Sequence, residues 1–376
     1  MSRLAEVVVL LRADSSERIG TGHVARCLAL ASALRRRGAD CRFVSRSHLG
    51  HRNDLIRAQG FQVAELPRTG QRSPAVAITA HDDWLDCDWR SDARQTASAW
   101  PGLHADWLVV DHYALEANWE RNLRESAGHM LVIDDLADRQ HVCDVLLDQN
   151  LGRNAEDYAD RVETSCQLLL GPQFALLREE FAREREASLR RRQSPALARL
   201  LVTMGGVDAG NATGTVLEAL LTCSRLPDSL EIVVVMGSGS PKLSELQVIA
   251  ARLPWRTQVL VDVGNMAELM RGSDLIIGAA GGTAWERCCL GVPTIAVSLA
   301  RNQRGILSAL QGAGAVLALE IEGQPDRSFA VALAEALSLT SDPGKLRLLS
   351  ERAAALVDGQ GAERVADVMA QRTGRV

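Results

Sequence analysis

The sequence predicts an α/β protein built from two domains, each with a parallel β-sheet. Its 376 residues are a length typical of two domains. Short apolar runs rich in Val, Ile and Leu recur with helical stretches between many of them, as expected for strands buried on both faces of a parallel sheet. These runs lie at 7–11, 108–110, 131–133, 145–147, 168–170, 200–203, 232–236, 275–277 and 294–297.

A charged helix is expected to separate the two domains. Residues 174–195 mix apolar and charged side chains and end at Pro195, which cannot continue a helix. A new strand begins at Leu200. We therefore predict an N-terminal domain over 1–173, a connecting helix over 174–195 and a C-terminal domain over 196–376.

Composition excludes several partners and several kinds of chemistry. A net charge of -5 leaves no global positive field, so we expect neither nucleic acid nor an anionic membrane as the main partner. Of the 42 basic residues only Lys242 and Lys345 are lysines, and neither has the sequence context of a P-loop or a pyridoxal Schiff base.

The sequence also favours a cytoplasmic protein. No apolar run approaches the roughly 18 residues that span a bilayer, and the first apolar run is too short for a signal peptide. The eight cysteines form no C-x-x-C pair, and a chain of this length does not need disulfides, so free thiols in a reducing compartment are expected.

Polar residues follow the predicted strands of the first half. Asp14 comes soon after the first apolar run, Asp111 follows the second, Asp134 the third, and Asn150 the fourth. Because open parallel sheets bind ligands outside the carboxyl ends of their strands, these residues are expected to line one site. A helix cap or a turn is the alternative for any single Asp.

A glycine-containing loop follows the first strand and leads into a helix. It ends in Gly20-Thr21-Gly22-His23. The positive end of the helix dipole favours a neutral imidazole at His23, which can act as a general base.

Two other interpretations of this loop stay open. Gly20, Gly22 and Ala25 match the dinucleotide pattern G-x-G-x-x-[GA], and Arg46 could hold an NADP phosphate. About eight residues separate the first glycine from the strand, whereas the pattern places it directly after the strand. The simpler alternative is that the glycines only shape a loop capped by His23.

Two strand, glycine and helix units occur in the second half. The first ends in Gly205 and Gly206, and the second spans 274–286. Free backbone N–H groups at helix N-termini favour phosphate, so a diphosphate is the expected ligand. Thr283 and Glu286 also match a capping box, and a carboxylate in that turn can accept hydrogen bonds from ribose hydroxyls.

No metal or organic cofactor is expected. The sequence contains His48 with His51 and acidic pairs at 82–83 and 134–135, but no H-E-x-x-H motif and no clustered Cys/His spacing. Solvated loops explain these pairs.

Taken in order, the motifs resemble those of the PseG family of pseudaminic acid pathway hydrolases. The resemblance spans most of residues 8–305, while 70–105 and the tail after 310 are less distinctive. The matching segments are 15–31, 111–113, 133–138, 146–150, Gly171-Pro172 with 175–178, 204–206 with Asp208, and 285–293 followed by Asn302-Gln303.

The resemblance implies the GT-B fold, in which two Rossmann-like domains with parallel sheets face a central cleft, as in the lipid II-forming transferase MurG. It implies metal-independent hydrolysis of UDP-2,4-diacetamido-2,4,6-trideoxy-β-L-altropyranose to UDP and the free sugar, with inversion at the anomeric carbon. A bacterial role in pseudaminic acid biosynthesis and flagellin glycosylation is implied too, with a small-molecule UDP-sugar as partner. We expect a monomer.

The resemblance also assigns roles to residues. The implied catalytic residues are His23, Tyr113 and Asn302. The implied UDP-binding residues are Gly205, Gly206, Asn265, Met266, Gly281, Gly282, Thr283 and Glu286. Asp14, Gly22 and Asp111 are expected to position the substrate. A GT-B glycosyltransferase, an NADP-dependent oxidoreductase and a catalytically silent nucleotide-sugar sensor are the alternatives.

Overall fold

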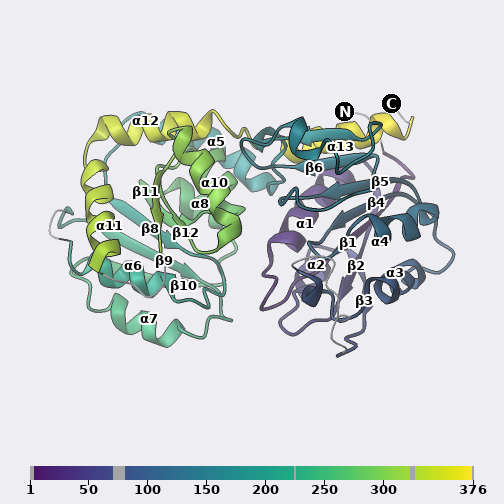
Figure 1. The fold of residues 1–376 in the computed structure, drawn as a ribbon. Helices are drawn as coiled ribbons and strands as arrows, with labels where there is room; N and C mark the ends of the chain where they lie inside the picture. The colour runs from purple at the N-terminus through teal and green to yellow at the C-terminus, as the bar shows by residue number, and fades with distance from the viewer. Residues whose placement is uncertain (1–3, 71–80, 224–225, 322–326, 375–376) are drawn as a thin grey trace. The chain divides into compact units, whose positions relative to one another are not determined.

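The computed structural model describes residues 4–70, 81–223, 226–321 and 327–374. The chain divides into two compact units, drawn in Figure 1. Unit 1 comprises Met1–Arg178 and Gln360–Val376, and unit 2 comprises Glu179–Gly359. Each unit contains one sheet whose described pairings are parallel, as the sequence predicts.

The sheet of unit 1 has the strand order β3-β2-β1-β4-β5-β6-β7. Its strands are β1 (Val8–Ala13), β2 (Asp40–Arg46), β3 (Gln62–Leu66), β4 (Ala105–Asp111), β5 (Ala127–Ile133), β6 (Val145–Asp148) and β7 (Gln167–Leu170). The order reverses direction between β1 and β4, and such a switch point is where open parallel sheets bind ligands.

Helices cover both faces of this sheet because alternate strand residues point to opposite faces. Val9 and Leu11 pack with α1 and α13, whereas Leu10 packs with Trp119 of α4. The helices of unit 1 are α1 (Gly22–Arg36), α2 (Asn53–Ala58), α3 (Trp89–Ser98), α4 (Ala117–Leu123) and α13 (Gly361–Arg372). Its 3-10 turns are η1 (Asp82–Trp84), η2 (Arg124–Ser126), η3 (Ala155–Tyr158) and η4 (Pro172–Phe174).

The predicted domain boundaries and the structure differ at α13. This helix packs in unit 1, although it follows unit 2 in the chain. It contacts α1 (Figure 1), and it buries Val365 and Met369 in the same core as β1. Arg37 at the end of α1 binds Glu363 and Asp367, each at 2.6 Å. The predicted C-terminal domain over 196–376 therefore ends at Gly359. Periodicity indicates that a helix has an apolar face but not which core that face covers.

The sheet of unit 2 has the order β10-β9-β8-β11-β12-β13, with its switch point between β8 and β11. Its strands are β8 (Arg199–Thr203), β9 (Glu231–Met236), β10 (Arg256–Val261), β11 (Leu275–Ala279), β12 (Thr294–Ser298) and β13 (Leu317–Glu320). Its helices are α5 (Glu179–Arg191), α6 (Ala212–Leu220), α7 (Leu243–Ala250), α8 (Met266–Arg271), α9 (Thr283–Cys289), α10 (Arg301–Gly312), α11 (Arg327–Leu339) and α12 (Pro343–Ala354).

The charged helix predicted between the domains is part of unit 2. Arg185 of α5 donates to the carbonyls of Ala354 and Val357 at 2.8 Å, and α5 also contacts α8 and α9. Among the described residues, no helix combines the length and the apolarity needed to cross a bilayer.

We predict that Gly361→Ala weakens the packing of α13 in unit 1. A Cβ at this first residue of α13 would lie 2.3 Å from the carbonyl oxygen of Ala175, so backbone must move. Forced overpacking of this kind costs about 1–3 kcal/mol, and thermal unfolding of unit 1 should begin at lower temperature. Gly312→Ala in α10 is the control, because a Cβ there meets no described atom within 4 Å and the change should leave stability equal or higher. Equal melting curves for the two variants would contradict the prediction.

Candidate active site

His23 and Asp111 meet at the switch point of unit 1. His23 is the second residue of α1, which follows β1, and Asp111 is the last residue of the adjacent strand β4. The Nδ1 atom of His23 lies 2.6 Å from Oδ1 of Asp111, and both side chains are buried. When Nδ1 donates to Asp111, Nε2 of the neutral ring is left as an acceptor, the arrangement a general base needs.

Arg26, one turn further along α1, holds this carboxylate in place. Its Nε and Nη2 donate to the two oxygens of Asp111 at 2.6 and 2.7 Å. Its Nη1 donates to Asp135 at 2.7 Å. Burial alone would raise the pKa of Asp111, but Arg26 and His23 outweigh burial and hold that pKa below its usual range. Asp111 is therefore ionised.

Tyr113 joins the same hydrogen-bonded network. Its hydroxyl donates to Asp135 at 2.7 Å, and its ring meets the ring of His23 edge-on at 4.6 Å. Burial and the negative charge of Asp135 raise the pKa of Tyr113 well above its usual value, so the phenol stays protonated. We call His23, Arg26, Asp111, Tyr113 and Asp135 the Asp111 network.

Asp14, which was expected to position substrate, is engaged with protein groups instead. Its side chain is fully buried, and its carboxylate accepts from Arg12 at 2.5 and 2.9 Å and from the backbone N–H of Arg46 at 2.7 Å. The Nε2 of His48 lies 3.3 Å from the same group. Arg12, His112 and His48 together outweigh burial and keep the pKa of Asp14 well below its usual range. This geometry suits an anchor beneath the site.

Arg46, the expected NADP phosphate ligand, is occupied as well. Its guanidinium is fully buried and donates to Asp92 at 2.6 Å, to Gln95 at 2.8 Å and to the carbonyl of Pro67 at 2.5 Å. A buried guanidinium with these partners does not face a ligand. Arg46 is therefore not available to bind the NADP phosphate that the dinucleotide interpretation of the first glycine loop requires.

The ends of β5 and β6 bring further predicted polar residues together. The hydroxyl oxygen of Tyr158 lies 3.0 Å from Asp134 and 2.8 Å from Asp148, and the amide of Asn150 donates to the carbonyl of Asp135 at 3.2 Å. Burial, with Asp135 nearby, raises the pKa of Asp148 to about 6. These groups support the loop that carries Asp135.

In unit 2, the two glycine loops follow the adjacent strands β8 and β11 at the switch point. Gly205 has a φ of 107°, a conformation that favours glycine. A Cβ added at Gly205, Gly206 or Gly282 would meet no described atom within 4 Å, so both loops border open space. Gly281 is half-buried beside Gln303.

The two helix N-termini of the predicted phosphate site differ in their capping. Asp208 accepts from the backbone N–H groups of Ala212 and Thr213 at 2.9 and 2.8 Å, so a carboxylate already caps α6. At α9, no side-chain hydrogen bond caps the helix among the described residues, and the capping box expected from Thr283 and Glu286 does not form.

A buried cation lies behind the second glycine loop. Arg287 of α9 donates to the carbonyl of Ala279 at 2.6 Å and to the hydroxyl of Thr283 at 3.1 Å. Burial lowers the pKa of Arg287 to about 10, which still leaves it charged at neutral pH. Sequence reasoning missed Arg287 because an arginine inside a helix pattern usually indicates a solvated face.

The other predicted residues are spread over four helices. Asn265 is exposed before α8 and donates to Glu268 at 3.1 Å, and Met266 is the first residue of α8. Glu286 is half-buried in α9. Asn302 lies in α10, but its side chain is outside the described part of the structure. Gly22 is exposed next to His23 as the first residue of α1.

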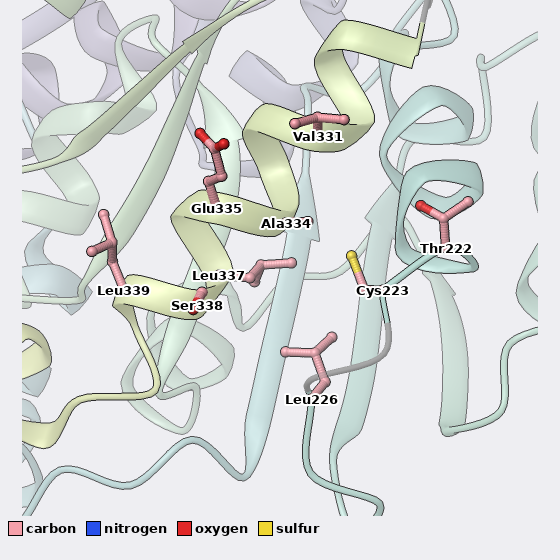
Figure 2. A pocket seen from close by; sticks show the side chains of 9 residues that line it. All are labelled: Thr222, Cys223, Leu226, Val331, Ala334, Glu335, Leu337, Ser338 and Leu339. Atoms are coloured by element: carbon pink, nitrogen blue, oxygen red, sulfur yellow. The ribbon is translucent and has the colours of Figure 1, made fainter.

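Figure 2 shows a separate cavity of about 570 Å³ in unit 2, between the end of α6 and α11. Cys223, Leu226, Leu337 and Leu339 are among its lining residues. None of its lining residues is a predicted site residue. Within the described ranges, no three or more His, Cys, Asp or Glu side chains are grouped to hold a metal ion.

Comparison with solved structures defines the class of fold. MurG from Acinetobacter baumannii matches over 97% of this chain and 99% of its own, with a TM-score of 0.68 and 18% identity. The glycosyltransferase of kitacinnamycin matches over 99% and 100%, with a TM-score of 0.64 and 19% identity. The protein therefore has the two-domain GT-B fold, and the predicted fold class is confirmed.

Comparison with curated sequences points to a particular relative. The chain is 26% identical over 306 residues to the UDP-2,4-diacetamido-2,4,6-trideoxy-β-L-altropyranose hydrolase of Campylobacter jejuni. The match covers 81% of this chain and 97% of that protein. The resemblance drawn from the motifs is confirmed at this level of similarity. No family model matches the sequence.

We predict that Asp14→Asn destabilises unit 1. The change leaves Arg12 without one of its buried counter-charges, and breaking a buried pair in this way costs about 3–5 kcal/mol. Asp40→Asn is the matched control, because the Asp40–Arg42 pair is partly exposed and worth less than about 1 kcal/mol. Urea unfolding measures both. An Asp14 variant as stable as the Asp40 variant would show that Asp14 is not an anchor.

Proposed function

We propose that the protein hydrolyses UDP-2,4-diacetamido-2,4,6-trideoxy-β-L-altropyranose to UDP and the free amino sugar, with inversion at the anomeric carbon. The observation that carries this proposal is the buried His23–Asp111 pair at a switch point, which supplies a base. Similarity to the Campylobacter jejuni hydrolase supports the choice of substrate. The reaction would belong to bacterial pseudaminic acid biosynthesis in the cytoplasm, ahead of flagellin glycosylation.

His23 is assigned the role of general base. Its Nε2 takes a proton from water as the water oxygen bonds to the anomeric carbon, on the ring face opposite the UDP oxygen. The bond between the anomeric carbon and that oxygen breaks, and UDP leaves with the electron pair. Asp111 fixes the tautomer and stabilises the imidazolium that forms, while Arg26 keeps Asp111 ionised. The imidazolium then returns its proton to solvent.

Unit 2 is assigned the UDP site. The backbone of Gly281 and Gly282 and the positive end of α9 are suited to the diphosphate, and the buried charge of Arg287 adds to their field. Together they would stabilise the leaving group without a metal. The further UDP contacts proposed are Gly205, Gly206, Asn265, Met266, Thr283 and Glu286.

Tyr113 and Asn302 complete the proposed catalytic set. The Tyr113 hydroxyl donates to Asp135 and its ring contacts the His23 ring edge-on. Tyr113 is therefore assigned the role of holding the imidazole in its orientation. Gly22 and Asp111 remain the proposed substrate-positioning residues at the start of α1 and the end of β4.

A UDP-sugar glycosyltransferase is the second candidate, favoured by the enzymes whose solved structures match this fold. It would use the same UDP site and pass the sugar to an acceptor rather than to water. Fold alone does not separate the two reactions.

We expect UDP release when the protein is incubated with the UDP-diacetamido-trideoxy-altrose, EDTA and no acceptor. Proton NMR should show the free sugar with inverted anomeric configuration as the first product, because water is the only nucleophile present. The rate with added Mg²⁺ serves as the comparison. UDP release that requires an added acceptor would favour the transferase, and release that requires Mg²⁺ would contradict the assigned role of α9 and Arg287.

We predict that His23→Ala lowers turnover by about 10²- to 10⁴-fold, the usual contribution of a general base. UDP affinity, measured by calorimetry, should stay within about twofold because the UDP site is assigned to unit 2. His129→Ala is the control, since His129 is a partly exposed residue of β5 outside the Asp111 network. Turnover of the His23 variant within threefold of the parent would remove His23 from the mechanism.

A further inference from the structure

Two aromatic rings outside the Asp111 network, those of His81 and Trp84, pack against the rings of its members His23 and Tyr113. The Trp84 ring stacks on Tyr113 with centroids 5.4 Å apart and an interplanar angle of 26°. The His81 ring meets Trp84 at 4.7 Å and Tyr113 at 5.2 Å, and the His23 ring meets Trp84 edge-on at 6.3 Å. The segment that carries His81 and Trp84 thus lies directly beside the proposed base.

Trp84 differs from the tryptophans that only build the core. Trp107, Trp119 and Trp285 are fully buried, whereas Trp84 is partly exposed. Tyr113 covers one face of its indole, which fixes the orientation of the ring. Large, rigid aromatic surfaces of this kind dominate the lining of sites for small organic ligands.

The segment around Trp84 lies outside the motifs that carry the resemblance to the hydrolases. It is tied to the first glycine loop by Arg18, whose guanidinium lies 3.4 Å from Asp83. Because both of these side chains are largely exposed, the pair adds little stability. The position of Trp84 therefore depends on its ring contacts with Tyr113 and His81 and on its packing against the hydrophobic cluster around Trp119.

The proposed substrate offers an unusually apolar sugar. As a 2,4-diacetamido-2,4,6-trideoxy hexose, it carries a methyl group at C6 and two acetamido methyl groups, and it keeps a free hydroxyl only at C3. The two amides and the C3 hydroxyl still form hydrogen bonds, but the methyl group at C6 leaves that side of the ring without a polar group and with apolar area to remove from water. An aromatic side chain recognises this methyl side better than a polar group would.

We propose that Trp84, with His81 beside it, forms the wall of the sugar subsite and contacts the C6 methyl side of the sugar ring. This assignment rests on the proposed function and adds the residue that selects a 6-deoxy sugar. The stack on Tyr113 presents the free part of the indole next to His23, where the anomeric carbon must lie for a base to act.

The test compares two non-hydrolysable ligands, the methylene phosphonate analogues of the UDP-sugar with either CH₃ or CH₂OH at C6. Calorimetry with the full chain should show that the methyl form binds about 10- to 100-fold more tightly, the range that a hydrophobic pocket achieves for small differences. Trp84→Ala should weaken binding of the methyl form at least about tenfold and bring the ratio near one. UDP alone should bind within twofold of wild type.

Two further variants separate recognition from folding. Trp84→Phe keeps an aromatic ring and should retain most of the preference. Trp89→Ala removes a nearby, half-buried tryptophan that stacks with Arg90 instead, and should leave the ratio unchanged.

An unchanged ratio in Trp84→Ala would overturn the inference, and so would a wild-type protein that binds the methyl analogue no better than UDP. Failure of the proposed function has a different signature. In that case wild type binds the analogues with the expected ratio, yet releases no UDP from the natural glycosidic linkage.

Discussion

A carboxylate shut off from solvent at the end of β4 sets the arrangement of the first unit's site. Burial alone would raise the pKa of Asp111, and a protonated Asp111 would not orient His23 as a base. Arg26 removes this conflict, because its guanidinium contacts both Asp111 and Asp135. Three groups from α1, β4 and the loop after β5 must therefore keep their positions together. The fixed position of Asp135 also fixes Tyr113, whose hydroxyl donates to it, and through Tyr113 the Trp84 ring that stacks on it.

The two units have the same switch point in their sheets but place different residues there. In each sheet the strand order reverses next to the first strand of the unit, and the loops that leave the two central strands diverge there. Unit 1 fills this place with charged and aromatic side chains. In unit 2 this place holds glycines, with Arg287 buried behind them. The proposed base and the proposed phosphate site would thus lie at equivalent switch points of two sheets with the same strand order.

The sequence predicts the central strands well because they are continuous apolar runs, as in β4 and β11. The interior strand β2 and the edge strands β3, β10 and β13 are missing from these runs because they mix polar residues with apolar ones. His23 and Asp111 could be predicted from motif and strand end. The partners of Asp14 could not, since Arg12 and Asp92 become neighbours only through the fold. Nor does periodicity reveal that Arg287 is buried.

The return of α13 to unit 1 has a consequence for synthesis of the chain. The ribosome makes Met1–Arg178 first, then all of unit 2, and only then the helix that covers part of the core around α1. At about 5–20 residues per second, the gap lasts about 10–40 s. During that interval the apolar face that later receives Val365 and Met369 is uncovered. All of unit 2 has been synthesised by then, whereas the core of unit 1 becomes complete only when α13 follows.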